Sequence, residues 1–269
     1  MKSTRLPGKI LMPLPIIGGK PLLSYITDEL KQSKFKNEII LATSINKEND
    51  VLVSFCDKQE IICYRGDEEN VLSRFTNIAK NGVYDCVVRL TGDNPIIDIT
   101  FLDNAIKTHF TNQNDYTSTE NLPIGMNFEI ISTKSLLNIE NHVLTNSDKE
   151  HVTLFIRNND KYKKEVFTCE LPIEYRNLRL TVDYASDYSL LSILLSLGIQ
   201  KNNLKGIALI EYAYNNYGYI FDINSSNIQK RQYSNIDEEI IEACKILDKF
   251  EYNRVSDILR NYKNFDKLE

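Results

Sequence analysis

Apolar residues along the chain follow two alternating patterns. Short continuous apolar runs predict buried strands at residues 38–43, 60–64 and 86–91. Apolar residues at helical spacing predict helices near residues 22–30, 47–58, 71–79 and 100–110. Strands that alternate with helices through short connections are typical of a mostly parallel sheet covered by helices. The sequence therefore predicts an α/β fold.

The pattern is looser in the second half of the chain. Strands are predicted at residues 128–131, 165–171 and 178–182, and a helix at residues 188–197. The run Asn-Ser-Ser-Asn at residues 224–227 predicts a linker. Beyond it, residues 236–250 and 254–262 have the spacing of two amphipathic helices. We therefore expect one α/β domain over residues 1–223 and a helical appendage over residues 228–269.

The composition narrows the range of functions. The chain has 269 residues, of which 42% are hydrophobic, enough for a sizeable core and too many for a disordered chain. Its net charge of −5 and its pI near 5.4 argue against a protein that coats nucleic acid. No apolar run approaches the length of about 20 residues that a membrane span needs. We therefore expect neither nucleic acid nor a membrane as a partner.

The cysteines and the amino-terminal residues bear on location. The chain has five cysteines, an odd number without the CxxC spacing of a zinc site, which does not fit a disulfide framework. We predict reduced, buried thiols. Residues 1–9 contain no apolar stretch after their basic residues, unlike a secretory signal. These features together predict a cytoplasmic protein.

The first candidate for chemistry is the segment Ser-Thr-Arg-Leu-Pro-Gly-Lys at residues 3–9. Ser3 and Thr4 supply hydroxyls, and Arg5 and Lys9 supply positive charge. Such a loop can surround a polyphosphate, because hydroxyl and backbone N–H groups donate hydrogen bonds while the cations offset its charge. Basic residues near a chain end are also commonly just solvated. The segment alone leaves both interpretations open.

Two aspartates follow apolar strand candidates. Asp93 comes after the strand predicted at residues 86–91, and Asp183 comes after the one at residues 178–182. Ligands of open α/β sheets bind beyond the carboxyl ends of strands, and carboxylates suit Mg²⁺ that is also held by substrate phosphates. Asp93 could instead accept N–H bonds in the turn before Pro95, and Asp187 could be a first-turn helix acid.

Five short motifs occur in order along the chain and carry a resemblance. They are residues 3–9, Gly-Lys-Pro-Leu at 19–22, Arg-Gly-Asp at 65–67 with Val-Leu-Ser-Arg at 71–74, Thr-Gly-Asp-Asn-Pro at 91–95, and Thr-Val-Asp-Tyr at 181–184. Together they resemble the cytidylyltransferases of spore-coat polysaccharide biosynthesis, relatives of the acylneuraminate and keto-deoxyoctonate cytidylyltransferases. The resemblance covers residues 1 to about 197.

The resemblance implies a nucleotidyltransferase domain over residues 1–223, with a Rossmann-like nucleotide-diphospho-sugar transferase fold. It implies transfer of CMP from CTP to a sugar, a sugar acid or a similar small acceptor, with release of pyrophosphate. This reaction would serve the biosynthesis of a surface polysaccharide or another glycan. A homodimer is an open alternative to a monomer.

The resemblance also implies roles for individual residues. Arg5, Lys9 and Asp93 would be catalytic, with Arg5 and Lys9 on the triphosphate, and Asp93 and Asp183 would hold Mg²⁺. The implied substrate-binding residues are Ser3, Thr4, Lys20, Thr43, Ser44, Arg65, Gly66, Asp67, Arg74, Asn127, Glu129 and His151. Residues 43–44 and 65–74 would lie near the base and ribose, and His151 near the acceptor. Many relatives have aspartate where Asn127 stands.

Three alternatives concern the start of the chain and the reaction. Relatives begin with an apolar strand ending in Gln-Ala-Arg just before the methionine that aligns with Met1, and a start codon called too late would explain why this sequence lacks it. A truncated, non-catalytic paralogue that binds nucleotide or promotes assembly is the second alternative. The third is a metal-dependent glycosyltransferase of related fold.

Overall fold

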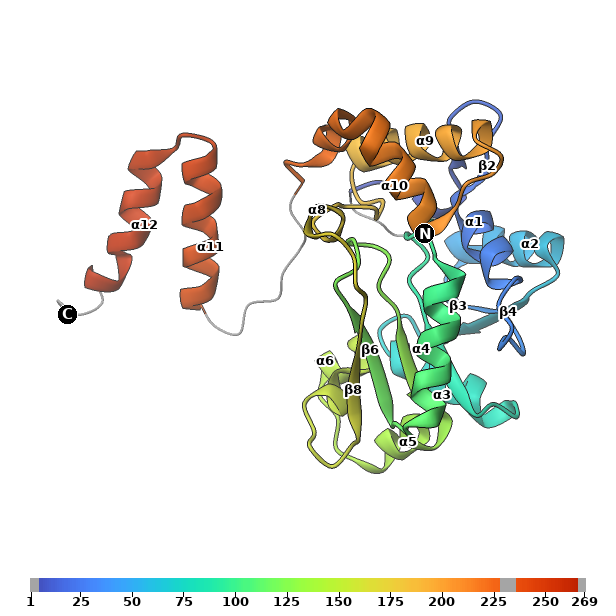
Figure 1. Cartoon of the computed structure of the whole chain (residues 1–269). Helices are drawn as coiled ribbons and strands as arrows, with labels where there is room; N and C mark the ends of the chain where they lie inside the picture. Colours follow the sequence, from blue (N-terminus) through green and yellow to red (C-terminus); the bar gives the residue numbers. More distant parts are fainter. Residues whose placement is uncertain (1–4, 228–235, 266–269) are drawn as a thin grey trace. The chain divides into compact units, whose positions relative to one another are not determined.

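The computed structural model describes residues 5–227 and 236–265 (Figure 1). By its internal contacts the chain divides into two compact units, Met1–Asn227 and Ile228–Glu269. Ser3 and Thr4, two of the predicted substrate-binding residues, lie outside the described residues. Within the described ranges no helix has both the length and the apolar character needed to cross a membrane.

The first part of unit 1 contains a parallel strand pair. Strand β3 (Ile40–Ser44) pairs in parallel with β4 (Ile62–Gly66), in a register that places Thr43 opposite Arg65 and Ser44 opposite Gly66. Helix α2 (Asp50–Gln59) joins them, and α1 (Leu22–Leu30) and α3 (Val71–Asn81) flank the pair in sequence. This strand–helix–strand unit confirms the alternation predicted from the apolar pattern.

The second part of unit 1 is a four-stranded sheet in the order β5-β7-β6-β8. Strand β7 (Glu129–Ser132) is antiparallel to both β5 (Cys86–Arg89) and β6 (Tyr116–Glu120), while β8 (Lys164–Thr168) is parallel to β6. Helix α4 (Ile99–Thr111) contacts β6 and β8, and Figure 1 shows it running beside them. The apolar pattern did not predict β6, because its sequence Tyr-Thr-Ser-Thr-Glu is largely polar.

Further short elements and helices complete unit 1. They are η1 (Lys9–Leu11), β1 (Pro13–Leu14), β2 (Lys20–Pro21), η2 (Lys47–Asn49), α5 (Thr133–Asn138), η3 (Ile139–Asn141), α6 (Asn146–His151), α7 (Leu154–Arg157), α8 (Ile173–Arg176), α9 (Ala185–Gln200), α10 (Gly206–Tyr217) and η4 (Gly218–Asn224). Helix α9 lies in the main core, where Leu190, Leu191 and Leu194 are fully buried. A second, smaller core contains residues of α3, α5 and α7.

The predicted strand at residues 178–182 does not join a sheet. It is an extended segment with one β-bridge, between Ile124 and Arg179. Its backbone then contacts the loop after β5, where the Val182 N–H donates to the Asp93 carbonyl at 3.0 Å. Gly125 permits the close approach: its φ is +100°, and a Cβ there would lie 2.7 Å from backbone atoms of Leu180 and Thr181. The strand prediction was wrong, yet the segment still brings Asp183 toward Asp93.

The predicted linker at residues 224–227 is part of unit 1. Asn224 is buried, and the side chains of Asn224 and Asn227 both donate to the Asp187 carboxylate. Unit 2 is a hairpin of two helices, α11 (Ile236–Lys249) and α12 (Asn253–Phe265), as the amphipathic spacing predicted. Cys244 and Ser256 are buried between these helices and hydrogen-bond each other's backbone carbonyls.

Candidate functional site

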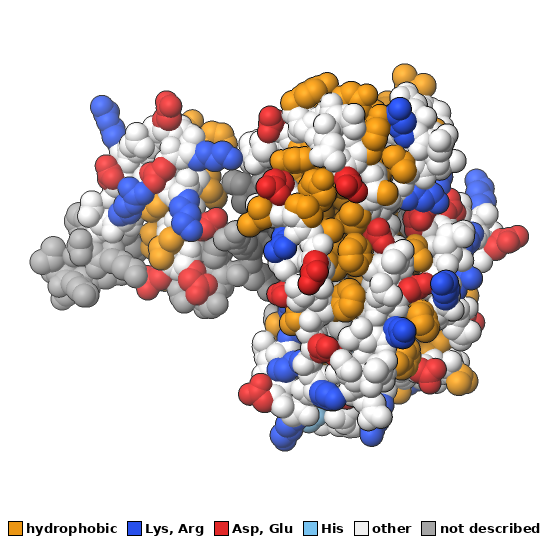
Figure 2. Space-filling view, in the orientation of Figure 1, with side chains coloured by type: hydrophobic (Ala, Val, Ile, Leu, Met, Phe, Trp, Pro, Cys, Tyr) orange, Lys and Arg blue, Asp and Glu red, His pale blue; other side chains and the backbone are white. Residues whose placement is uncertain are grey.

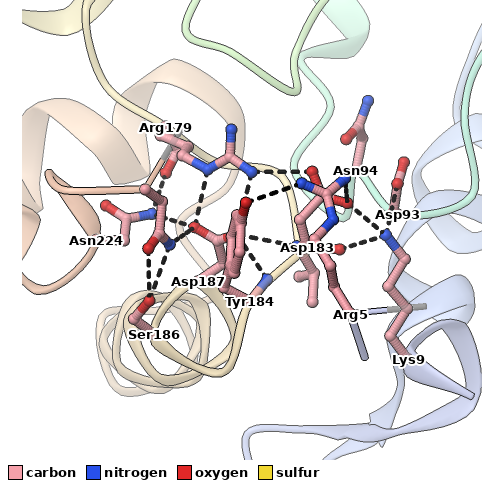
Figure 3. A network of polar contacts seen from close by, with 12 residues as sticks. Arg5, Lys9, Asp93, Asn94, Arg179, Asp183, Tyr184, Ser186, Asp187 and Asn224 are labelled. Atoms are coloured by element: carbon pink, nitrogen blue, oxygen red, sulfur yellow. Dashed lines mark hydrogen bonds and ion pairs between the residues drawn. The ribbon is translucent and has the colours of Figure 1, made fainter. Parts of the chain in front are cut away.

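Lys9 belongs to a polar cluster that includes Asp93, in the loop after β5, and Asp183 (Figure 3). It begins the short η1 helix directly after Gly8, whose φ of +72° is in the region that glycine adopts readily. Its Nζ atom lies 2.8 Å from Asp93 Oδ2 and 2.9 Å from Asp183 Oδ1, and it also donates to the Val182 carbonyl. The structure therefore brings together both aspartates that the sequence proposed as a pair.

Asp93 is positioned by the loop that follows β5. The loop is closed by Asn94, whose N–H bonds the Thr91 carbonyl and whose side chain bonds the Thr91 hydroxyl at 2.7 Å. The backbone carbonyl of Asp93 accepts the N–H of Val182. The carboxylate of Asp93 forms an ion pair with Lys9. Its role is therefore not limited to accepting N–H bonds in the turn before Pro95, the alternative considered from sequence.

Asp183 is surrounded by three cations. Besides Lys9, Arg5 Nη2 lies 3.2 Å from its Oδ1 atom and Arg179 Nη2 lies 2.9 Å from its Oδ2 atom. Burial raises the pKa of Asp183, but its bonds to Lys9, the charge of Arg5 and the bond from Arg179 outweigh burial, so the pKa is lower than usual. Asp183 is therefore ionised at neutral pH, and in this structure its charge is balanced by the three cations.

Asp187 is the buried support behind Asp183. It is fully buried, and it pairs with Arg179 through Nε at 3.0 Å and Nη2 at 3.2 Å. It also accepts the backbone N–H groups of Asp183 and Tyr184 at the start of α9. Burial raises the pKa of Asp187, but the hydrogen bonds from Arg179 and from these N–H groups outweigh burial, so the pKa is lower than usual. Asp187 is an acid in the first turn of α9, as the sequence allowed, and it also fixes the backbone that carries Asp183.

Arg179 was not proposed from sequence, because it lay within a predicted buried strand. The spacing Arg-x₃-Asp-x₃-Asp at residues 179–187 was the available signal. Arg5, the other guanidinium, donates to the Tyr184 hydroxyl at 3.1 Å and lies over the Tyr184 ring at 4.9 Å. The cluster contains three cationic and three carboxylate side chains, Arg5, Lys9, Arg179, Asp93, Asp183 and Asp187.

The predicted base and ribose residues lie at the carboxyl ends of β3 and β4. Thr43 and Ser44 are buried, and the guanidinium of Arg65 donates to three carbonyls, at residues 44–46. Gly66 allows close packing of Arg74, because a Cβ at residue 66 would lie 2.8 Å from Arg74 Cγ. Asp67 accepts two backbone N–H groups and so shapes the turn before α3.

Arg74 carries the clearest sign of a ligand in this region. Its Nε atom is buried and has no hydrogen-bond partner in the part of the chain that the structure describes. Burial lowers the pKa of Arg74, while the nearby Asp67 and Glu68 raise it, and the net shift is downward. A buried donor without a partner costs free energy, and a ligand oxygen would remove that cost.

The predicted acceptor-side residues lie on and near β7. The Glu129 carboxylate is held by Arg89 at 2.6 Å, Tyr116 at 2.5 Å and Thr153 at 2.8 Å. Thr153 follows Val152, a β-branched residue with a φ of +53°. The N–H of Thr153 donates to the carbonyl of His151. A β-branched residue with positive φ is strained, and such strain concentrates at functional sites. Asn127 is exposed and accepts a hydrogen bond from the Thr119 hydroxyl at 3.3 Å.

Lys20 is placed in a different environment from the Lys9 cluster. Its ammonium pairs with Asp28 at 2.5 Å and lies over the Tyr25 ring at 4.3 Å. It lines a cavity of about 270 Å³ formed with residues of α1, α9 and α10. No contact joins it to Lys9, Asp93 or Asp183 among the described interactions, so its predicted support of the triphosphate stays a prediction.

The donor set of the cluster fits a magnesium ion that is shared with a substrate. Asp93 and Asp183 offer two carboxylates to one cation, while the described residues contain no group of three or more His, Cys, Asp or Glu side chains suited to a metal. Mg²⁺ is commonly held by one or two carboxylates together with substrate phosphates. A cluster of cations and carboxylates beyond the carboxyl end of β5 lies where ligands bind in open α/β sheets.

Comparison with known proteins gives the family. The profile described as cytidylyltransferase matches residues 1–214, so the chain belongs to the cytidylyltransferase family and is an enzyme of the nucleotidyltransferase class. The spore coat polysaccharide biosynthesis protein SpsF of Bacillus subtilis is 38% identical over 195 residues, which cover 70% of this chain and 80% of that protein. The family resemblance found from the five motifs is confirmed.

Solved structures confirm the predicted α/β nucleotidyltransferase fold. A cytidylyltransferase from Leptospira borgpetersenii matches with a TM-score of 0.74 and 27% identity, over 86% of this chain and 94% of that chain. A CMP:2-keto-3-deoxy-manno-octonic acid synthetase complexed with CTP matches with a TM-score of 0.55 and 15% identity, over 72% and 94% of the two chains. The second likeness shows the fold alone.

Proposed function

We propose that the protein transfers CMP from CTP to a sugar, a sugar acid or a similar small acceptor, in the biosynthesis of a surface polysaccharide or another glycan. The single observation that supports this most is the meeting of Arg5, Lys9, Asp93 and Asp183 in one cluster. These residues come from three distant parts of the sequence, and all four were expected from the family resemblance. The likeness to SpsF supports the pathway, and the CTP complex of a protein of the same fold supports the nucleotide.

In the proposed reaction an acceptor oxygen attacks the α-phosphorus of CTP. The bond from that phosphorus to the bridging oxygen breaks, pyrophosphate leaves, and the acceptor proton passes to solvent. Asp93 and Asp183 would hold Mg²⁺, which when bound neutralises phosphate charge. Arg5 is exposed beside Asp183 and can bind a phosphate oxygen through a guanidinium nitrogen. The fixed positions of these groups orient the phosphates for in-line attack.

Two flanking regions would complete the substrate site. Arg74, with its buried and unpartnered Nε, is our candidate for a donor to the nucleotide. The Glu129 carboxylate, together with Asn127 and His151, is our candidate for the acceptor side. Because Arg89, Tyr116 and Thr153 already hold Glu129, its carboxylate is fixed in place before the acceptor arrives.

A thermal-shift panel tests the nucleotide. We expect CTP with Mg²⁺ to raise the melting temperature of the full chain, and UTP, GTP and ATP to raise it much less. A ligand present at a hundred times its Kd stabilises by about 2.7 kcal/mol, which corresponds to roughly 5–10 °C for a unit of this size. An equal response to all four nucleotides would contradict the proposal.

Turnover separates the remaining alternatives. A cytidylyltransferase releases pyrophosphate only when CTP, Mg²⁺ and an acceptor are all present. A non-catalytic paralogue would bind CTP without pyrophosphate release, and a glycosyltransferase would consume a nucleotide-sugar instead. Pyrophosphate can be counted with a coupled phosphate assay across a panel of sugars and sugar acids, which would also identify the acceptor.

The proposed location is the cytoplasm. All five cysteines are free, as the sequence predicted, and three of them are buried. Burial, with a smaller contribution from a neighbouring aspartate, raises the pKa of Cys86 and of Cys169 to about 11. Thiols with so high a pKa are unreactive at neutral pH and are typical of structural cysteines in a reducing compartment.

We also propose a homodimer, formed through the helical hairpin of unit 2. Helical spacing places most of the apolar residues of α11 and α12, though not Ile241, to one side of the Cys244–Ser256 contact on both helices, so they share one face of the hairpin. Several of them are exposed, from 47% for Val255 to 67% for Ile258. Figure 2 shows apolar side chains between charged ones on this unit. Two helices alone cannot bury such a face.

Charge favours a second copy of the chain as the partner of this face. Helix α11 has five acidic and two basic residues, while α12 has three basic and one acidic residue. In a two-fold symmetric pair of hairpins, the acidic helix of one copy can pack beside the basic helix of the other. The result would be a four-helix bundle with an apolar interior.

The dimer prediction is tested by a charge placed on the apolar face. We expect the wild-type chain to have twice the monomer mass of 31.1 kDa in light scattering, and Val255→Glu to have once that mass. Asn261→Glu, which adds the same charge on the polar side of α12, should stay dimeric. A monomeric wild type, or a dimeric Val255→Glu protein, would show that the hairpin is not the dimer contact.

A further inference from the structure

The ammonium of Lys9 has no free hydrogen-bond donor in this structure. An ammonium has three N–H groups, and three acceptors surround this one: Asp93 Oδ2, Asp183 Oδ1 and the Val182 carbonyl. The side chain is only 11% exposed. In this arrangement Lys9 holds the two carboxylates together and cannot also donate to a phosphate.

The same two carboxylates are the only proposed protein ligands for Mg²⁺. A cation within 3 Å of both repels a second cation, and it occupies one oxygen atom of each carboxylate, the side that the two groups turn toward each other. Lys9 and a divalent ion therefore compete for one position. The roles proposed for Lys9 and for the two aspartates cannot all be fulfilled in the conformation observed here.

We propose that Lys9 is a built-in substitute for the metal ion. Its ammonium keeps divalent ions out of the free protein, and it leaves the two carboxylates when a magnesium–nucleotide binds. This inference rests on the proposed function of the site. On binding, the ammonium exchanges its carboxylate partners for phosphate oxygens, and no covalent bond changes. The metal would then bind only together with the nucleotide, and the free protein would not hold a bare ion.

The surroundings of Lys9 allow this exchange. Lys9 begins a three-residue 3₁₀ helix after a glycine, and that helix start has no side-chain cap. Asp183 keeps its place without Lys9, because Arg179 and Arg5 still hold its carboxylate. The six side chains of the cluster carry equal numbers of positive and negative charges, so a bare divalent ion would add uncompensated charge. A magnesium nucleoside triphosphate brings its own negative charge and avoids this cost.

Manganese binding to the full chain without nucleotide tests the proposal. Free Mn²⁺ is measured by electron paramagnetic resonance during titration of the wild type, Lys9→Met and Lys9→Arg. We expect Lys9→Met to bind Mn²⁺ at least tenfold more tightly than the wild type, since it keeps an unbranched side chain, one atom shorter, and removes the charge. Lys9→Arg keeps the charge and should exclude Mn²⁺. Lys80→Met, which removes a lysine paired with a different carboxylate, that of Glu140, should match the wild type.

Two further measurements make the test independent of the Lys9→Met variant alone. Lys9→Met combined with Asp183→Asn should lose the gained Mn²⁺ affinity, which would assign the site. In the wild type, CTP should increase Mn²⁺ affinity beyond the binding by CTP alone, a measurement that needs no variant. Mn²⁺ binding by the free wild type as tight as that with CTP would overturn the proposal, and so would an unchanged affinity in a folded Lys9→Met protein.

The Lys9 proposal and the proposed function can each fail without the other, and the measurements distinguish the two cases. If the wild type binds CTP with Mg²⁺ but Lys9→Met gains no metal affinity, the exchange is wrong and the nucleotide site stands. If Lys9→Met gains metal affinity and no nucleotide stabilises the wild type, Lys9 is a metal substitute in a protein whose substrate is something other than a nucleotide.

Discussion

Replacing Asp183 with alanine is expected to lower the rate of CMP transfer by about a hundredfold to a thousandfold, the usual cost of removing one charge-stabilising group from an active site. Asp183 contacts three cations and is one of the two carboxylates placed to hold the metal. Asp93→Ala should have a similar effect, because Asp93 is the other carboxylate. The measurement is pyrophosphate release from CTP with Mg²⁺ and the acceptor that the wild type uses.

The rate loss should not come from unfolding. Without Asp183, Arg179 still pairs with Asp187 and Lys9 still pairs with Asp93. Circular dichroism melts of both variants should therefore show a folded protein at the assay temperature. Asp160→Ala is a matched control, because it also removes an aspartate from a lysine ion pair, that with Lys164, but lies outside the cluster. Normal turnover in both Asp93→Ala and Asp183→Ala would refute the site.

The largest effect on stability is expected for Asp187→Ala. This carboxylate is fully buried, and its removal leaves the buried guanidinium of Arg179 with a single partner, Asp183. Breaking a buried ion pair by removing one partner costs about 3–5 kcal/mol. The change should lower the melting temperature of the full chain by roughly 10 °C, measured by circular dichroism at neutral pH.

Two variants calibrate this result. Asp28→Ala breaks a pair in which both side chains are about 40% exposed, 41% for Lys20 and 38% for Asp28, and should cost no more than about 1 kcal/mol. Asp187→Asn keeps an oxygen that accepts the N–H groups at the start of α9 and should lie between the two. If Asp187→Ala were as stable as Asp28→Ala, the support of Asp183 by a buried pair would be disproved.

The fold followed from the sequence where an element is buried and regular. Strands β3, β4 and β5 were predicted because each is a continuous apolar run, and the amphipathic helices α11 and α12 because one face is apolar. Strand β6 was missed because its sequence is polar, although it lies between β7 and β8 in the sheet. Its hydrogen bonds come from neighbours that are distant in sequence, and a local pattern contains no information about them.

The candidate site, like the fold, was predicted only in part from the sequence. Arg5, Lys9, Asp93 and Asp183 were expected together because their motifs matched one family in order. Arg179 was missed, since it lay in a predicted buried strand, and its spacing to Asp183 and Asp187 does not by itself show that they pair. Lys20 lies in another cavity, because spacing along the chain does not specify which loop faces which carboxylate.

The sequence by itself determined which segments are apolar, where chemistry-bearing residues follow them, and to which family the chain belongs. Only the tertiary structure decided that the segment before Asp183 crosses to the loop of Asp93, and that Lys9 lies between the two carboxylates. The physical reason is that burial and helical spacing are local properties of a sequence. The distance between two charges 90 residues apart in sequence depends on how the whole chain packs.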